Sequence, residues 1–290
     1  MHSAAALAMS LLLSQMLLLL AVASAVPDDR CQRKCGDVDI PYPFGIGAIG
    51  TNCSWDRESE DYICSRTETA GTGANCFLGE DFNLTCYTME SGLIKPFFGD
   101  LEFLNISLVM GQVRMLNDIS SACFNRDYNN VTYSRWGFDL GGSYRFSNLR
   151  NKFTVIGCET LGYIVDDHGN NRYYQSGCVS MCRDEQSIVN DSCSGMGCCQ
   201  TSIPKNLRYY EVWFDENFDN SDTWRFSNCS YAVLLEAESF QFHSSYITTN
   251  QLMQINGDGV PVVLDWAIGN ETCEVAKRNL SSYVCVSAHS

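Results

Sequence analysis

The sequence has little positive charge. Its 290 residues contain 19 Lys and Arg against 34 Asp and Glu, which gives a net charge of −15. A nucleic-acid-binding protein needs a basic surface to displace counterions from phosphates, so this class is excluded, and unaided binding to an anionic membrane is disfavoured. Hydrophobic residues make up 45% of the chain and charged residues only 18%, a balance that predicts a folded protein with a sizeable core.

Long apolar runs are also scarce. One covers residues 7–22 and is followed by Ala23-Ser24-Ala25, the small-residue pattern that signal peptidase cleaves. No later window approaches the 18 or so apolar residues of a membrane-spanning helix. The sequence therefore predicts a signal peptide over residues 1–25 and a mature chain without a membrane span, with an uncleaved signal anchor as the alternative.

Catalytic and metal-binding signatures are missing. There is no G-x-S-x-G motif, and no pair of carboxylates stands out for glycoside hydrolysis. The acidic segment 215–221 has the alternating oxygens of a calcium loop, but Asn220 replaces its turn glycine and Phe226 its bidentate Glu. We predict no enzyme activity, no cofactor and no resident metal.

Cysteine is abundant. All 16 cysteines follow the predicted signal peptide, and an even number in an oxidising compartment indicates disulfides rather than a zinc site. A gap separates two groups of eight, each of which can close its own bridges, so we expect modules over 26–165 and 166–290. Each group permits about a hundred pairings, which leaves the connectivity open. The groups are Cys31, Cys35, Cys53, Cys64, Cys76, Cys86, Cys123 and Cys158, then Cys178, Cys182, Cys193, Cys198, Cys199, Cys229, Cys273 and Cys285.

Eight Asn-x-Ser/Thr sequons agree with the secretory route, because glycans are attached there. The predicted glycosylation sites are Asn52, Asn83, Asn105, Asn130, Asn190, Asn228, Asn270 and Asn279.

Hydrophobic alternation predicts strands over 104–110, 209–214 and 260–266, and a β-branched run predicts another over 153–156. The sequon at Asn105 places one face of the first strand toward solvent. Segment 231–242 fits either two helical turns or a strand. The fold class is therefore predicted as β-rich and disulfide-stapled, with two cysteine-rich modules and few short helices.

Four ordered motifs resemble the extracellular region of plant wall-associated receptor kinases. Residues 31–47, with Pro41-Tyr42-Pro43-Phe44, are similar to the opening of the galacturonan-binding domain of that family, and residues 151–158 to its closing strand. Residues 177–204 resemble the cysteine-rich region that follows, and residues 260–268 the stretch leading into EGF-like repeats.

Receptors of this family continue through EGF-like repeats, a transmembrane helix and a kinase. This chain stops at Ser290, without the Gly-rich loop or catalytic Asp of a kinase. We therefore expect a secreted protein of the apoplast and cell wall, bound to a membrane only if the gene product extends beyond Ser290 or the signal stays uncleaved.

The resemblance implies binding of pectin, a polymer of galacturonate carboxylates. An acidic protein needs a local cationic site, or a bridging calcium ion, to bind this polymer. Positive charge gathers at 30–34 and in 140–158, and the second stretch has no acidic residue. Arginine binds carboxylates bidentately, and aromatic rings can stack on sugars. The predicted polysaccharide-binding residues are Arg30, Arg33, Lys34, Tyr42, Phe44, Arg145, Arg150 and Lys152.

Non-catalytic pectin or galacturonan binding is thus the predicted function. One alternative is an ectodomain that partners full-length receptors of the same family or acts as a decoy, with Trp213, Phe214 and Phe218 at its interface or in its core. A polysaccharide hydrolase is the other alternative.

Overall fold

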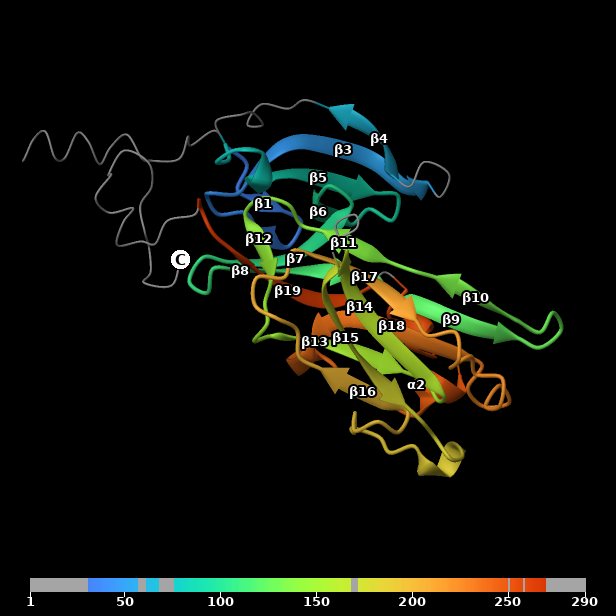
Figure 1. Ribbon diagram of the computed structural model, residues 1–290. Coiled ribbons are helices and arrows are strands. Elements are labelled where there is room, and N and C mark those ends of the chain that lie inside the picture. The colour runs from blue at the N-terminus through green and yellow to red at the C-terminus, as the bar shows by residue number, and fades with distance from the viewer. Residues whose placement is uncertain are drawn as a thin grey trace, which may run out of the picture. The chain divides into compact units, whose positions relative to one another are not determined.

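Strands dominate the computed structural model, which describes residues 31–56, 61–67, 76–167, 172–249, 251–257 and 259–269 (Figure 1). Its described helices are short, and seven disulfides link its described cysteines. The predicted β-rich, disulfide-stapled class with few short helices is confirmed. Among these residues, no helix has the length and apolarity needed to cross a membrane. The predicted signal peptide lies outside the described residues.

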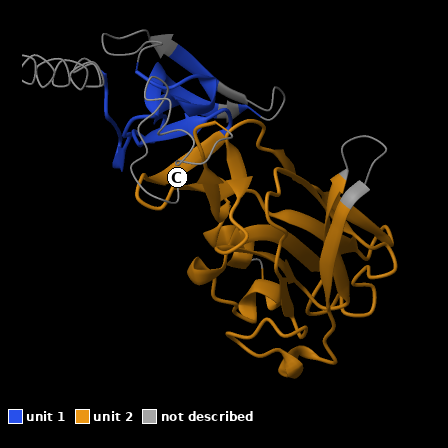
Figure 2. Cartoon of the chain, turned by 60° about the vertical axis from the view of Figure 1, so that its left-hand side comes forward, with its two compact units in different colours: residues 1–100 blue, residues 101–290 orange. Residues whose placement is uncertain are grey.

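The chain forms two compact units, residues 1–100 and 101–290 (Figure 2). In unit 1, β3 pairs with β4 and, in parallel, with β5, while β6 pairs with the other edge of β5 and β1 pairs with β2. Three disulfides lie within this unit: Cys31–Cys76, Cys35–Cys86 and Cys53–Cys64. Its elements are β1 (Lys34–Cys35), β2 (Val38–Asp39), β3 (Gly45–Asp56), β4 (Asp61–Thr67), η1 (Glu80–Phe82), β5 (Asn83–Met89) and β6 (Ile94–Phe98).

The described residues of unit 2 form three groups of paired strands, in the orders β10-β9-β18-β13-β16, β11-β17-β14-β15 and β12-β19-β8-β7. Its strands are β7 (Leu101–Ser107), β8 (Gln112–Asn117), β9 (Ser120–Asn125), β10 (Asn130–Ser134), β11 (Gly137–Asp139), β12 (Tyr144–Phe146), β13 (Asn151–Ile156), β14 (Thr160–Asp167), β15 (Arg172–Ser180), β16 (Cys198–Thr201), β17 (Tyr209–Phe214), β18 (Cys229–Glu236) and β19 (Val260–Trp266). Its helices are η2 (Glu185–Ser187), η3 (Ala237–Ser239), α2 (Ser245–Thr248) and α3 (Gln251–Ile255).

The predicted strands at 153–156, 209–214 and 260–266 are confirmed as β13, β17 and β19. In β17 the expected alternation holds, since Tyr210, Val212 and Phe214 are buried. The first predicted strand is β7, which begins at Leu101 and ends at Ser107, and Asn105 is exposed on it as expected.

Strand β18 resolves the segment that fitted either helix or strand. It pairs with β9 on one side and β13 on the other, and every residue from Ser230 to Glu236 is buried. Tyr231, Val233 and Leu235 pack in one cluster with Phe242 from the segment after the strand. A strand buried on both faces needs no polar positions, so its sequence loses the alternation that identifies half-buried strands.

The four-stranded sheet packs directly on the five-stranded sheet. Gly162 of β14 makes this approach possible, because a Cβ atom there would lie 2.7 Å from Cγ2 of Val155 in β13 and 3.4 Å from Cβ of Ala232 in β18. In the neighbouring strand β17, Phe214 pairs with Gly162 and shares this packed face. Tyr209, Glu211 and Trp213 therefore lie on the opposite face of the sheet.

The module boundary expected between Cys158 and Cys178 is replaced by a division at residue 100. The reason is that β14 contains the expected boundary, between residues 165 and 166, and pairs with β15 in one sheet. Disulfides Cys123–Cys229 and Cys158–Cys182 also join the two expected halves, so the cysteines do not separate into self-contained groups. The remaining pairs are Cys178–Cys199 and Cys193–Cys198, and Cys273 and Cys285 lie outside the described residues.

Candidate functional site

The predicted binding residues of unit 1 differ in their exposure and in their contacts. Arg33 is structural, because its Nη1 donates hydrogen bonds of 3.1 Å to the carbonyl oxygens of Phe44 and Cys76. The Phe44 side chain has 0% exposure and packs edge-on against Phe82, with the ring centroids 5.1 Å apart. The prediction that Phe44 stacks on sugars is therefore wrong. Lys34 and Tyr42 are exposed. Arg30 lies outside the described residues.

The predicted cations of unit 2 are held by separate partners. The Arg145 guanidinium donates to the carbonyl oxygens of Gly142, at 3.0 Å, and Tyr144. Arg150 forms ion pairs with Glu236 at 3.4 Å and Glu238 at 3.0 Å. The Lys152 ammonium donates to the Ser202 hydroxyl at 2.6 Å. The stretch 140–158 has no acidic residue of its own, but Glu236 at the end of β18 and Glu238 in η3 bring two carboxylates to Arg150.

Glu236 anchors this charge network. Its carboxylate is buried, with 6% of the side chain exposed, and it also accepts a hydrogen bond of 2.6 Å from Nη2 of Arg114. We expect Glu236→Ala to lower the free energy of unfolding by about 1–2 kcal/mol, because it leaves Arg114 without this partner while water replaces part of the loss at the half-exposed arginines.

Glu238→Ala is the matched control for this prediction. Glu238 is 73% exposed, so its removal is expected to cost less than about 0.5 kcal/mol. Urea unfolding of both variants measures the difference, and equal losses would contradict the anchoring role of Glu236.

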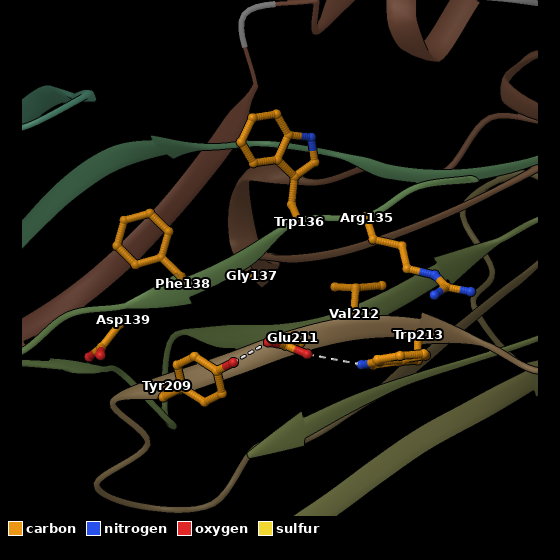
Figure 3. Close-up of a pocket in the computed structure, with 9 residues that line it drawn as sticks. All are labelled: Arg135, Trp136, Gly137, Phe138, Asp139, Tyr209, Glu211, Val212 and Trp213. Atoms are coloured by element: carbon orange, nitrogen blue, oxygen red, sulfur yellow. Dashed lines mark hydrogen bonds between the residues drawn. The ribbon is translucent and has the colours of Figure 1, made fainter. Parts of the chain in front are cut away.

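A groove of about 430 Å³ is lined by residues 135–139, which include β11, and by Tyr209 and residues 211–213 of its paired neighbour β17 (Figure 3). Tyr209, Glu211 and Trp213 alternate with the buried residues of β17, so they share its outward face. Gly137 of β11 lies opposite Glu211, and a Cβ atom there would come within 2.9 Å of Cγ of Glu211. Glycine at this position therefore gives the Glu211 side chain its room.

Aromatic rings and carboxylates line this groove. The Glu211 carboxylate accepts hydrogen bonds from the Tyr209 hydroxyl and, at 3.2 Å, from the Trp213 indole N–H (Figure 3). The Arg135 guanidinium stacks on Trp213 at 4.3 Å from the ring centroid. Trp136 is 43% exposed. Concave sites that combine aromatic rings with a few fixed polar groups are typical of small-molecule and sugar binding.

A second surface combines an indole with two arginines. The guanidinium carbons of Arg126 and Arg225 lie 4.4 Å and 5.7 Å from the ring centroid of Trp224. We call Arg126, Trp224 and Arg225 the indole–arginine cluster. Both arginines are exposed, and in the described parts of the chain neither has an ion pair within 4.0 Å. The cluster therefore offers two guanidiniums to an incoming anion.

The β9–β18 pairing positions this cluster. Cys123 of β9 and Cys229 of β18 are register partners and are joined by a disulfide. The Phe124 N–H donates to the Asn228 carbonyl at 2.7 Å just beyond the bond. Arg126 comes directly after β9, and Trp224 lies shortly before β18. The pairing of these two strands therefore brings together segments about a hundred residues apart in the sequence.

The residues of these two surfaces were not predicted from the sequence, except for Trp213, which was a candidate for an interface. An available signal was the adjacency of a tryptophan and an arginine, in Arg135-Trp136 and again in Trp224-Arg225. Of the other interface candidates, Phe214 is buried in the core and Phe218 is half-buried.

The acidic segment 215–221 closes local turns. Asp215 accepts a hydrogen bond of 2.9 Å from the Asn217 N–H, and Asp219 accepts one of 2.9 Å from the Ser221 N–H. The described residues contain no group of three or more His, Cys, Asp or Glu side chains arranged to hold a metal ion.

The chain is similar to wall-associated receptor kinases of Arabidopsis thaliana. It is 33% identical to wall-associated receptor kinase 2 over 251 residues, which cover 86% of this chain and 29% of that protein. It is also 33% identical to wall-associated receptor kinase 3 over 262 residues and to wall-associated receptor kinase 5 over 267 residues. These matches cover 86% and 89% of this chain and 30% and 31% of the relatives.

No protein-family model and no solved structure matches the chain. The resemblance predicted from the four motifs is confirmed by the relatives, and the chain spans less than a third of their length.

Proposed function

We propose that this chain, a relative of the wall-associated receptor kinases, is a secreted, non-catalytic protein that binds the galacturonate carboxylates of pectin. The indole–arginine cluster is the observation that carries this proposal. Two exposed guanidiniums held beside one indole suit a uronate sugar, because a guanidinium binds a carboxylate bidentately.

Such binding has to be local, because the chain carries a net charge of −15 and pectin is a polyanion. Attraction at the cluster acts over a few ångströms, whereas repulsion from the rest of the surface is screened by salt over about 8 Å at physiological ionic strength. Lys34 and Tyr42 of unit 1, and Arg145 and Lys152 of unit 2, are proposed as additional contacts. A calcium ion bridging protein and polymer carboxylates is a further proposed contribution.

Secretion and glycosylation are parts of the same proposal. Of the predicted glycosylation sites in the described residues, Asn83 is half-buried and the others are exposed, at Asn52, Asn105, Asn130, Asn190 and Asn228. Exposure of these side chains is what attached glycans require. Asn270 and Asn279 lie outside the described residues.

The test is retention of the oxidised, glycosylated protein on immobilised polygalacturonate. We expect retention at low salt and release as the salt concentration rises, because salt screens the ion pairs. Parallel columns with calcium and with a chelator separate direct from bridged binding.

Passage through both columns without delay would contradict the proposal and favour the alternative, an ectodomain that partners full-length receptors or acts as a decoy. Release of reducing ends from polygalacturonate would overturn the non-catalytic part of the proposal and favour a hydrolase.

A further inference from the structure

The predicted glycosylation site Asn228 lies at the edge of the indole–arginine cluster. Arg225 lies three residues before it, in a turn over 223–227 that two backbone hydrogen bonds of 3.0 and 2.9 Å close. In β9, the Phe124 N–H donates to the Asn228 carbonyl at 2.7 Å, and Arg126 follows Phe124 by two residues. The Asn228 side chain is exposed, so a bulky glycan attached to it starts beside both arginines.

The folded chain buries the third residue of this sequon. Glycan transfer recognises Asn-x-Ser/Thr as a unit, which here is Asn228-Cys229-Ser230. Ser230 has 1% exposure, and its hydroxyl donates to Oδ1 of Asn220 at 2.8 Å. A Cβ atom on Gly157 would lie 2.7 Å from the Ser230 hydroxyl oxygen, so the backbone after β13 packs directly on it. Transfer to Asn228 therefore has to precede the pairing of β18 with its neighbours.

The middle residue of the sequon, Cys229, has a disulfide partner that is synthesised much earlier. Cys123 lies 106 residues before Cys229, so synthesis at about 5–20 residues per second delivers it to the secretory pathway roughly 5–20 s ahead. The partner thiol is therefore present as soon as Asn228 emerges. Disulfides form over seconds or longer, so closure of this bond and glycan transfer act on the same segment at the same stage.

Asn52 provides an internal comparison, because it also precedes a bridged cysteine. Its neighbour Cys53 pairs with Cys64, which is synthesised 11 residues later instead of earlier. The third residue of this sequon, Ser54, is only half-buried. No disulfide partner is present when Asn52 emerges, and the folded strand hides its sequon less.

We propose that closure of the Cys123–Cys229 disulfide limits glycan transfer to Asn228, and that a glycan attached there shields Arg126 and Arg225. The chain is thus produced in two forms, one with an open and one with a shielded indole–arginine cluster. The inference does not rest on the proposed function, because both parts of it are measured without a polysaccharide.

The two competing reactions have different consequences for each other. In transfer, the Asn228 amide nitrogen bonds to the anomeric carbon of a lipid-linked oligosaccharide, the bond from this carbon to the lipid pyrophosphate breaks, and the amide loses a proton. In closure, the Cys123 and Cys229 thiols lose two protons and two electrons to a disulfide-carrying oxidant, which becomes a dithiol. A glycosylated chain can still close the disulfide, whereas a closed and paired chain no longer presents Ser230 to the transferase.

Mass spectrometry of the Asn228 peptide from the full chain, expressed in a plant secretory host, measures occupancy. Total cell extract is used, so that a variant that fails to fold is still counted. We expect incomplete occupancy in the wild type, and Cys123→Ser to lower the unoccupied fraction at least twofold. Cys178→Ser is the matched control, because it removes the Cys178–Cys199 bond of the same unit and leaves Cys123 in place. It is expected to leave the occupancy of Asn228 unchanged, as Cys64→Ser is for Asn52.

Modification by phenylglyoxal, which reacts with accessible arginines, tests the shielding. We expect Arg126 and Arg225 to react at least fivefold more slowly in the glycosylated form than in Asn228→Gln, and the exposed Arg183 to react equally in both.

Complete occupancy in the wild type, or equal changes in Cys123→Ser and Cys178→Ser, would overturn the competition between closure and transfer. Equal reaction of Arg126 and Arg225 in both forms would overturn the shielding. Retention of the two forms on polygalacturonate reports separately on the proposed function, so failure of one proposal leaves the other measurable.

Discussion

Replacing both Arg126 and Arg225 by glutamate is expected to weaken binding to polygalacturonate about hundredfold. Each arginine contributes a charge-assisted hydrogen bond worth about 1.5 kcal/mol to a carboxylate, and together these correspond to two powers of ten in affinity. Both side chains are exposed and contact the Trp224 ring, so the substitution leaves the core intact. Surface plasmon resonance on immobilised polygalacturonate measures the loss.

The matched control is Arg183→Glu combined with Lys205→Glu. These cations are also exposed, and this pair changes the net charge by the same amount, from −15 to −15 − 4 = −19. Retained binding in the control would show that the local geometry matters more than the total charge. Equal losses in both double variants would contradict a site at the indole–arginine cluster.

Removing the Cys123–Cys229 disulfide by a double substitution to alanine is expected to lower the free energy of unfolding by about 4–5 kcal/mol. The bond closes a loop between cysteines 106 residues apart. Without the bond the unfolded chain gains conformational entropy, and this gain grows with the length of the loop. The bond also joins β9 to β18 beside the indole–arginine cluster. We therefore expect weaker polygalacturonate binding by the same variant.

The Cys193–Cys198 disulfide provides the comparison. Its cysteines are 5 residues apart, so the same substitution there is expected to cost about 2 kcal/mol and to leave binding unchanged. Urea unfolding of both variants under oxidising conditions gives the two values. A larger loss for the short loop would contradict this account of the Cys123–Cys229 bond.

The half-buried strands were predictable because apolar and polar residues alternate along them. In β17 every second residue is buried, and in β19 the alternate residues Val260, Val262, Leu264 and Trp266 are buried together with Val263. Neighbours along the chain are sufficient to reveal this pattern. In β18 both faces are buried, so the local pattern is the same for a helix as for a strand. Only the pairing with β9 and β13 decided between them.

The binding residues were harder to predict, because exposure and partnership depend on distant segments. Phe44 stands only two residues after exposed Tyr42, yet it is buried against Phe82. Arg150 lies in a stretch without acidic residues, yet it pairs with Glu236 at the end of β18 and with Glu238 of η3. A cation counts as available only when the fold brings no carboxylate to it.

The strand-rich class, the disulfide chemistry and the resemblance to the wall-associated receptor kinases could be predicted from the sequence alone. These follow from composition, short-range periodicity and ordered motifs, all of which are local or additive along the chain. The tertiary structure alone decided the cysteine pairing, the division at residue 100 and the two aromatic surfaces of unit 2. Each of these requires residues far apart in the sequence to meet, and no local pattern specifies such a meeting.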